Sequence, residues 1–499
     1  MLAQIKRLGT DTAIYGISTV VGRFLNFILV PFYTNVLHPN EYGVVANVYA
    51  IIAFLNIVYA YGMESAYFKY ASTKELGSER QNFSAPFISL CVSSALFSAI
   101  LVAVAPSASR WMGVPPADAS VVPLSAGILF LDTVALVPFA SLRMQQKALL
   151  FGALKILNIV VNVAANLILL LHFHAGVEGI FLSGLIASLV TVLALVPTIV
   201  RQFTPEFPRS LYRALLVFGL PYVPAGLASM VIQVVDRPIM RLLTSDATLG
   251  VYQANYRLGI FMMLIVSMFD YAWRPFFLAH ADAPDAKKLF ARVLTYFSAF
   301  MTCVFLVLTF FIGDIVRIRV FGRTIIHPDY WGGLSIVPVV LIAYMFLGIY
   351  NNLIAGVYIQ KKTQHLPAIT LIGALVNIVA NFLLIPSMGM MGGAIATLLA
   401  YAAMAGALYR SVQSYYPVPY EWGRIAKVAS SAAIALVLSR LCVPWLNHFA
   451  LCGGLLLLFG ASLYFMRFFD AEEMQAIGRL LRRGSAHGEG NPSVPDSLE

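Results

Sequence analysis

Apolar runs of about twenty residues follow one another along almost the whole chain, from Thr10 to Phe469. As a helix, a run of this length crosses a hydrocarbon core of roughly 30 Å. Backbone groups in lipid must bond within their own segment, and the runs are too long for the strands of a membrane barrel. Hydrophobic residues make up 60% of the chain and charged residues 11%, which excludes an ordinary soluble domain. The sequence therefore predicts an all-α polytopic membrane protein.

The apolar runs predict about fourteen transmembrane helices. The expected spans are 10–37, 42–70, 82–106, 119–142, 148–172, 178–201, 211–243, 247–273, 289–316, 333–358, 365–386, 391–412, 424–443 and 449–468. The loops between them are short, so we expect no separate catalytic domain.

Most lysines and arginines fall in alternate loops, and this bias predicts that both termini lie in the cytoplasm. The exception is the predicted outer loop after residue 314, which carries Arg317, Arg319 and Arg323. Their role stays open. Because the basic residues are dispersed between apolar runs, the net charge of +10 does not indicate a nucleic-acid partner.

Two sets of residues recur along the chain in the same order. Pro31, Gly43, Val44 and Tyr49 return 207 positions later as Pro238, Gly250, Val251 and Tyr256. Ala140, Gln145, Lys147, Asn162 and Asn166 return 215 positions later as Ala355, Gln360, Lys362, Asn377 and Asn381. A duplication of this kind predicts two six-helix lobes plus two C-terminal helices, with a ligand bound between the lobes.

The repeat sets the expected domains. We expect an N-terminal lobe over 1–205, a C-terminal lobe over 206–414 and two additional transmembrane helices over 415–470. Residues 471–499 are expected to form a cytoplasmic tail that is partly disordered, because it ends in the polar stretch GSAHGEGNPSVPDSLE.

The motifs VPFYTNVLHPNEYGVVANVYAI and GLPYVPAGLAS…DRPIM…LGVYQANYRL, which open the two lobes, carry a family resemblance. The chain resembles the polysaccharide transporters of the multidrug/oligosaccharidyl-lipid/polysaccharide (MOP) superfamily, and within them the O-antigen type flippases of lipid-linked oligosaccharides. The resemblance covers about residues 10–470. It implies a multi-pass protein of the bacterial cytoplasmic membrane, whose lobes surround a central cavity that opens alternately to each side. The implied substrate is a polyprenyl-diphosphate-linked oligosaccharide, and the implied partners are the bilayer and other polysaccharide-assembly membrane proteins.

Two arginines lie inside predicted helices, Arg23 in GRFLNF and Arg257 in NYRLG. Arginine at the centre of a membrane helix costs about 2.5–3.5 kcal/mol on insertion scales, so it needs a reason to be there. A guanidinium offers paired donors that match phosphate oxygens, which makes both residues candidate ligands of a diphosphate. The alternative is an ion pair within the bundle, with Glu64, Asp132, Asp236 or Asp270 as partner.

Three carboxylates are candidates for coupling to H⁺ or Na⁺: Asp132, Glu64 and Asp270. Asp132 lies deep in its predicted helix, where a lone carboxylate must be paired or protonated. For Glu64 the alternative is a structural ion pair with Lys69 or Arg143 at the cytoplasmic rim. Whether transport is coupled to an ion stays open.

Amide side chains are candidate ligands of sugar hydroxyls: Asn158, Asn162, Asn166, Asn377, Asn381, Asn26 and Gln233. The first three share one face of a helix at a spacing of four residues. The alternative is hydrogen bonding between helices, which is common for Asn in membrane bundles.

Three prolines should interrupt or bend helices and are candidate hinges: Pro31, Pro221 and Pro224. A static kink is the alternative. The histidines and cysteines are scattered without metal-ligand spacing, so we expect no metal, no cofactor and no catalytic residue.

The sequence therefore favours a flippase for an anionic lipid-linked oligosaccharide rather than an enzyme. One alternative is a cation or drug antiporter of the same superfamily, in which acidic residues should outnumber arginines in the cavity. A second alternative is a membrane polysaccharide polymerase or ligase, which would need a long outer loop that the sequence does not contain.

Overall fold

The computed structural model describes residues 27–442, 447–470 and 473–474, and these form two compact units. The larger unit comprises the described residues of Met1–Ala286 together with Ile312–Pro417. The smaller unit comprises Lys287–Phe311 and the described residues from Val418 onward. The lobe boundaries at 205 and 414 stay a prediction.

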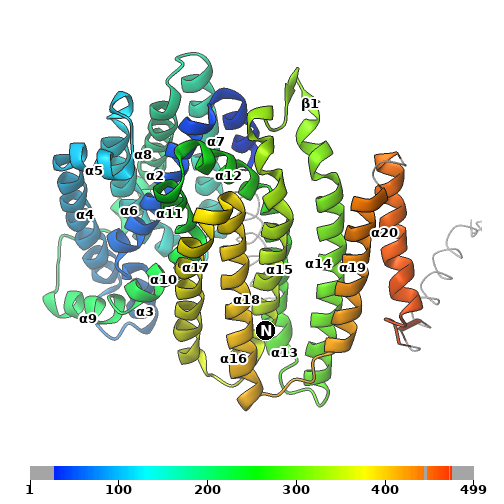
Figure 1. Ribbon diagram of the computed structural model, residues 1–499. Helices are drawn as coiled ribbons and strands as arrows, with labels where there is room; N and C mark the ends of the chain where they lie inside the picture. The colour runs from blue at the N-terminus through cyan, green and yellow to red at the C-terminus, as the bar shows by residue number, and fades with distance from the viewer. Residues whose placement is uncertain (1–26, 443–446, 471–472, 475–499) are drawn as a thin grey trace, which may run out of the picture. The chain divides into compact units, whose positions relative to one another are not determined.

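The first half of the larger unit is a bundle of helices joined by short turns (Figure 1). Its helices are Phe27–Val36, α2 (Pro39–Ala60), α3 (Met63–Thr73), α4 (Glu79–Ala103), α5 (Ala105–Met112), η1 (Pro116–Asp118), α6 (Val121–Met144), α7 (Ala148–Leu171) and α8 (Gly176–Gln202).

The second half repeats the plan of long helices interrupted by short breaks. It contains α9 (Arg209–Gly219), α10 (Tyr222–Val234), α11 (Asp236–Leu243), α12 (Asp246–Arg257), α13 (Ile260–Ala279), η2 (Pro328–Ile336), α15 (Val337–Leu353), α16 (Ala355–Ile359), η3 (Thr363–His365), α17 (Leu366–Met388) and α18 (Met390–Tyr415). The smaller unit contains most of α14 (Ala286–Arg317), together with α19 (Trp422–Cys442) and α20 (His448–Phe465).

The predicted fold class is confirmed. Every expected span has a helical counterpart in the described residues, although the first is described only from Phe27. Twelve helices of the described chain are long and apolar enough to cross a membrane. The one departure from an all-helical chain there is a hairpin of two-residue strands, β1 (Arg319–Val320) and β2 (Arg323–Thr324), in the loop with the unexplained arginines.

Several expected helices are divided, one of them at a proline and another at a glycine. Pro221 lies between α9 and α10, and α9 runs across the direction of its neighbours (Figure 1). Pro224 follows within the first turn of α10, where a missing backbone donor costs little. The expected helix 42–70 is also divided, because Gly62 adopts φ of 75° between α2 and α3. The sequence did not predict this second break.

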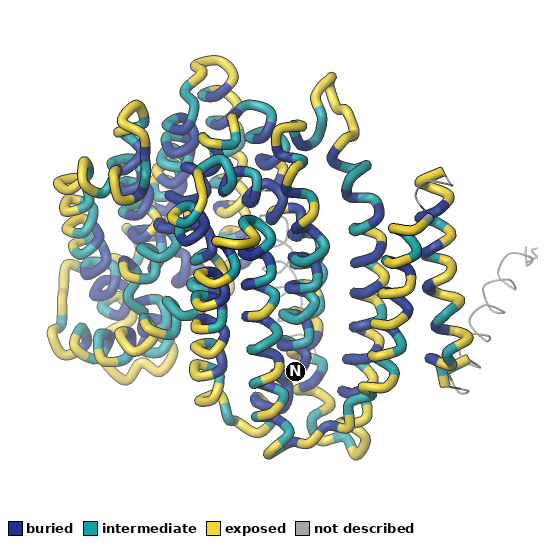
Figure 2. Tube along the Cα trace, viewed as in Figure 1, coloured by how far each residue is buried: buried dark blue, intermediate teal, exposed yellow. Residues whose placement is uncertain are grey.

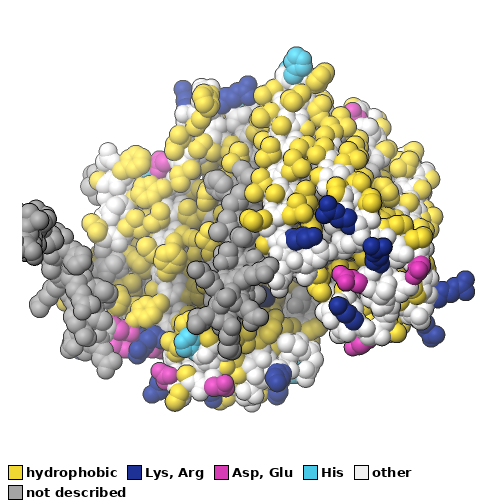
Figure 3. Space-filling view, turned by 180° about the vertical axis from the view of Figure 1, so that it is seen from behind, with side chains coloured by type: hydrophobic (Ala, Val, Ile, Leu, Met, Phe, Trp, Pro, Cys, Tyr) yellow, Lys and Arg dark blue, Asp and Glu magenta, His cyan; other side chains and the backbone are white. Residues whose placement is uncertain are grey.

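Apolar side chains cover much of the surface, as expected for helices that face lipid. Leu149 on α7 is 75% exposed, and Val200 on α8 and Val217 on α9 are each 69% exposed. Figure 2 shows exposed and buried stretches alternating along many helices, and Figure 3 shows hydrophobic side chains over most of the face it presents. Water would penalise this surface, whereas a bilayer does not.

The repeat is visible as a reciprocal contact between α2 and α12. A Cβ atom added at Gly43 would overlap the backbone oxygen of Asp246, and one added at Gly250 would overlap the backbone oxygen of Pro39. Gly43 and Gly250 correspond at the offset of 207, and so do Pro39 and Asp246. The two copies therefore meet through equivalent backbone surfaces, in a contact that only glycine permits.

We expect Gly250→Ala to destabilise the protein by about 1–3 kcal/mol, because the added methyl group forces α2 and α12 apart. The measurement is thermal unfolding in detergent. Gly406→Ala on α18 is the matched control, since a Cβ atom there meets open space. The control should be stabilised by up to about 1 kcal/mol through helix propensity. Equal melting temperatures of the two variants would contradict the close contact between α2 and α12.

The smaller unit is held together by charged and aromatic contacts near the start of α19. Arg424 pairs with Glu473 at 2.9 Å and lies over the ring of Phe468. Thr295 on α14 donates a hydrogen bond of 2.7 Å to Glu421. These contacts give its three helices a common anchor at one end.

Candidate substrate site

The larger unit contains three cavities, and neighbouring cavities share some of their lining residues. We name them the C-terminal cavity, of about 570 Å³, the N-terminal cavity, of about 310 Å³, and the Glu64 cavity, of about 550 Å³. Arg257 lines both the C-terminal and the N-terminal cavity. Asp132, Asn158 and Ser188 line both the N-terminal and the Glu64 cavity. The cavities therefore adjoin one another through these four side chains.

Arg257 is the last residue of α12, and its side chain is exposed to the cavities. The expected alternative was an ion pair within the bundle. No carboxylate of the described chain lies within ion-pair distance of Arg257. Its guanidinium is therefore a cation whose donors can reach a ligand.

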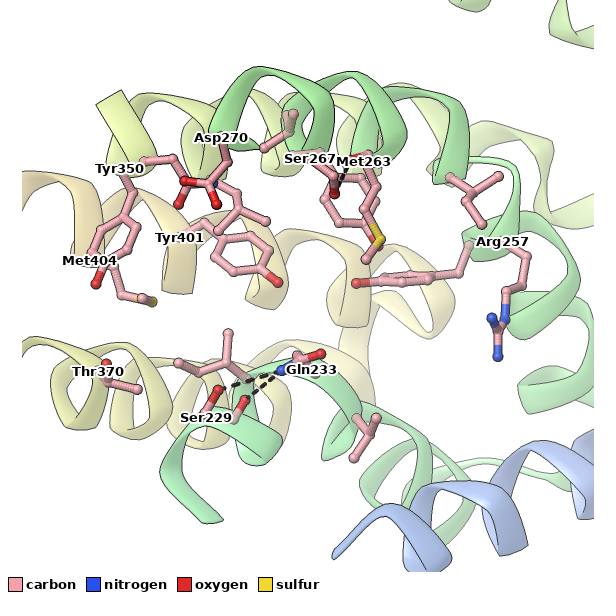
Figure 4. A pocket seen from close by; sticks show the side chains of 18 of the residues that line it. Ser229, Gln233, Arg257, Met263, Ser267, Asp270, Tyr350, Thr370, Tyr401 and Met404 are labelled. Atoms are coloured by element: carbon pink, nitrogen blue, oxygen red, sulfur yellow. Dashed lines mark hydrogen bonds between the residues drawn. The ribbon is translucent and has the colours of Figure 1, made fainter. Parts of the chain in front are cut away.

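The C-terminal cavity is walled by α10, α11, α12, α13, α15, α17 and α18. Figure 4 shows Asp270 and Tyr350 on one side of the space, facing Ser229, Gln233 and Thr370 on the other, with Arg257 at one end. Asp270, a predicted ion-coupling residue, is paired with Arg274 at 3.0 Å. The side chain of Gln233, a predicted sugar ligand, makes only long hydrogen bonds among the described residues, of 3.4 and 3.5 Å, both to Ser229.

A buried ion pair forms part of the wall of this cavity through Arg237, and the sequence did not predict it. Arg237 is 6% exposed and Asp236 is 2% exposed, with 2.7 Å between Nη1 and Oδ1. Arg237 also donates to Gln253 at 3.2 Å and lies over the ring of Tyr256. Its position directly after Asp236 in an apolar run was the available signal.

The N-terminal cavity brings several predicted residues together. Asp132 on α6 accepts a hydrogen bond of 2.7 Å from Ser188 on α8. Asn158 on α7 donates to Thr191 at 2.9 Å, and Asn162 lines the same cavity. Asp132 is therefore hydrogen-bonded and within reach of two cavities, and the ion-coupling role stays a prediction.

The Glu64 cavity contains a cationic and an anionic group that are already paired. Glu64 forms an ion pair with Arg143, which is one of the two partners expected for a structural anchor. Lys155 lies over the ring of Phe139 at 4.2 Å. A second candidate coupling residue is therefore compensated by a neighbouring charge.

The remaining predicted amides do not line these three cavities. Asn166 is fully buried, accepts a hydrogen bond of 3.0 Å from Tyr33 and donates to Asn162. Asn377 and Asn381 on α17 are fully buried, and Asn381 donates to the backbone oxygen of Asn377 at 2.8 Å. The same bond four residues apart thus occurs in both copies of the repeat. Their contact with sugars stays a prediction, and what the geometry shows is hydrogen bonding among buried side chains.

Arg23 and Asn26 lie outside the described residues. Pro31 lies within the helix Phe27–Val36, where its backbone oxygen accepts a hydrogen bond of 2.8 Å from Asn35. Pro221 breaks a helix as expected. Hinge movement at these prolines stays a prediction. Among the described residues, no group of three or more His, Cys, Asp or Glu side chains could hold a metal ion.

Residues 34–324 match the family described as "Polysaccharide biosynthesis protein". The match covers more than half of the chain, so the chain belongs to this family. Together with the fold, this confirms the family resemblance that the sequence predicted. No curated protein sequence matches the chain.

Solved structures with a similar fold include a lipid II flippase and MATE family transporters of the MOP superfamily. The inward closed conformation of the lipid II flippase MurJ aligns with a TM-score of 0.70 and 16% identity, over 91% of this chain and 99% of that chain. A multidrug resistance MATE family transporter in an inward-facing conformation aligns with a TM-score of 0.59 and 14% identity, over 79% and 94% of the two chains. A MATE family transporter in an outward-facing conformation aligns with a TM-score of 0.57 and 12% identity, over 82% of this chain and 95% of that chain. At these identities the likeness shows the fold alone, which this multi-pass chain shares with those transporters.

Proposed function

We propose that the protein is a flippase that moves an anionic, polyprenyl-diphosphate-linked oligosaccharide from the inner to the outer leaflet of the bacterial cytoplasmic membrane. The observation that carries the proposal is Arg257, which lies between two cavities without a carboxylate partner in the described chain. Every other cation that lines the three cavities has a carboxylate or an aromatic ring beside it. A diphosphate leaving water needs such an uncompensated cation.

The proposed transport step follows from the division of the larger unit into two repeated halves. Arg257 binds the diphosphate while the sugars occupy the polar cavities and the prenyl tail remains in lipid. The halves then rock about contacts such as Gly43 with Asp246, which exposes the headgroup to the other side. The cytoplasmic position of both termini and the O-antigen type of saccharide are parts of this proposal.

The antiporter alternative is less well supported by the charges. A hydrophobic cation would need a carboxylate without a compensating cation, but Asp270 and Glu64 are each paired with an arginine. Asp132 is the remaining carboxylate that lines the three cavities, and we assign it to coupling with H⁺ or Na⁺. Similarity to MurJ supports the lipid-linked class, since that protein is a lipid II flippase.

The test is transport in proteoliposomes that contain the full chain. We expect a fluorescent polyprenyl-diphosphate oligosaccharide to reach the opposite leaflet at least about tenfold faster than in empty vesicles, whereas a lipophilic cationic dye is not moved. Quenching of the fluorophore by a membrane-impermeant reductant measures the rate. Movement of the dye without movement of the glycolipid would establish the antiporter instead.

A further inference from the structure

The C-terminal cavity contains more aromatic surface than a diphosphate requires. Five tyrosines line it: Tyr256, Tyr271, Tyr344, Tyr350 and Tyr401. A sugar ring has a face of C–H groups that carry a small positive charge, and the face of an aromatic ring is negative. Tyrosines can therefore pack against sugar rings and also bond their hydroxyl groups.

Two amides in the same cavity have unused hydrogen-bonding capacity. Gln233 makes only long bonds to Ser229, and no hydrogen bond of the Asn351 side chain is found in the described chain. Thr370 also lines the cavity, where its hydroxyl donates to its own helix at 3.0 Å and lies beside the hydroxyl of Tyr350. Amides and hydroxyls arranged opposite aromatic rings suit a ligand that carries many hydroxyl groups.

The walls of the cavity are balanced in charge away from Arg257. Asp270 is paired with Arg274 at 3.0 Å, and Arg237 is paired with Asp236 at 2.7 Å. Apart from Arg257, the described residues of the cavity wall therefore offer a ligand carboxylate no uncompensated cation, and no new ion pair would offset the cost of its desolvation. The walls favour an uncharged ligand.

The size of the cavity restricts what can enter. Its volume of about 570 Å³ lies within the range of roughly 300–1,000 Å³ that is typical of small-ligand pockets. This space suits a few sugar units and is lined by too many polar groups for a prenyl chain. Because Arg257 lies at one end, a ligand anchored there by phosphate would extend its next units toward the tyrosines (Figure 4).

We propose that the C-terminal cavity is a saccharide subsite that binds uncharged sugars directly attached to the diphosphate. Tyr271, Tyr350 and Tyr401 pack against the sugar rings, while Gln233 and Asn351 bond their hydroxyl groups. The inference rests on the proposed function, because it takes the lipid-linked substrate as given. Beyond that function, it specifies where the sugars bind and that these sugars are uncharged.

Three lipids of equal chain length test the subsite with the full protein in nanodiscs. They are a polyprenyl diphosphate without sugar, the same lipid with an uncharged trisaccharide, and the same lipid with a trisaccharide that contains a uronic acid. We expect the uncharged glycolipid to bind at least about tenfold more tightly than the lipid without sugar. The uronic acid should remove most of this gain.

Variants separate the subsite from the phosphate site. Tyr271→Ala and Asn351→Ala should each reduce the gain from the uncharged sugars at least about threefold, with binding of the sugar-free lipid unchanged. Tyr464→Ala is the matched control, because Tyr464 is 59% exposed on α20 and lines none of the cavities. Unchanged binding of the sugar-free lipid also shows that each variant is folded.

Each failure has a different meaning. If sugars add no affinity to wild type, or if the variants keep the full gain, the subsite is wrong while the flippase proposal stands. If the uronic acid lipid binds as tightly as the uncharged one, the charge class is wrong. Should wild type bind none of the three lipids, the proposed function itself fails.

Discussion

Replacing Arg257 by alanine should slow glycolipid transport in proteoliposomes on the order of 100-fold, with the protein still folded. The expected size follows from the loss of charge-assisted hydrogen bonds to phosphate, since truncating one partner of a desolvated charge pair costs about 2–5 kcal/mol. Arg257 has no carboxylate partner in the described chain, so its removal leaves no buried anion behind. The melting temperature should therefore change little.

A conservative variant and a control variant test why the loss of Arg257 slows transport. Arg257→Lys keeps the charge but loses the paired donors, so we expect an intermediate loss of about tenfold. Arg110→Ala is the control, because Arg110 is exposed on α5 and makes only a long hydrogen bond, of 3.4 Å, to Ser107. Transport by the alanine variant at the wild-type rate would remove Arg257 from the site.

Replacing Arg237 by alanine should lower stability by about 3–5 kcal/mol, which is the usual cost of leaving one member of a buried ion pair alone. The carboxylate of Asp236 is 2% exposed and would keep the hydrogen bond from Tyr252 as its remaining side-chain contact. Thermal unfolding in detergent measures the loss, and the melting temperature should fall by at least about 5 °C.

The double variant Asp236→Asn with Arg237→Met should recover most of this stability, because it removes both charges and keeps the volume. This rescue distinguishes a structural ion pair from a substrate ligand. If Arg237→Ala instead melts like wild type but fails to transport, Arg237 binds the substrate and our assignment of the pair is wrong.

The sequence predicted the large features of the fold because the bilayer limits the choices. Apolar length alone specifies helices, and the offset of 207 between Gly43 and Gly250 identified the repeat that the structure shows as a reciprocal contact. Breaks at proline were also predictable. The break at Gly62 was not predicted, because glycine is permissive and the close approach of the Gly219 backbone to it is a tertiary contact.

The site was predicted less completely because burial within a helix cannot be assigned from one sequence. Arg257, Asp132 and Gln233 were expected at the site, and they line cavities. The five tyrosines that line the C-terminal cavity were not predicted, since tyrosines in apolar helices have many roles. Asn377 and Asn381 share the spacing of Asn162 and Asn166, and the helices packed against α17, chiefly α18, bury them completely.

The most direct measurement is an experimental structure of the full chain with a polyprenyl-diphosphate oligosaccharide bound. We predict density for the diphosphate with a phosphate oxygen about 2.7–2.9 Å from a guanidinium nitrogen of Arg257. Density for the first sugars should extend into the C-terminal cavity. A diphosphate bound away from Arg257, with the junction of the two cavities empty, would contradict the account.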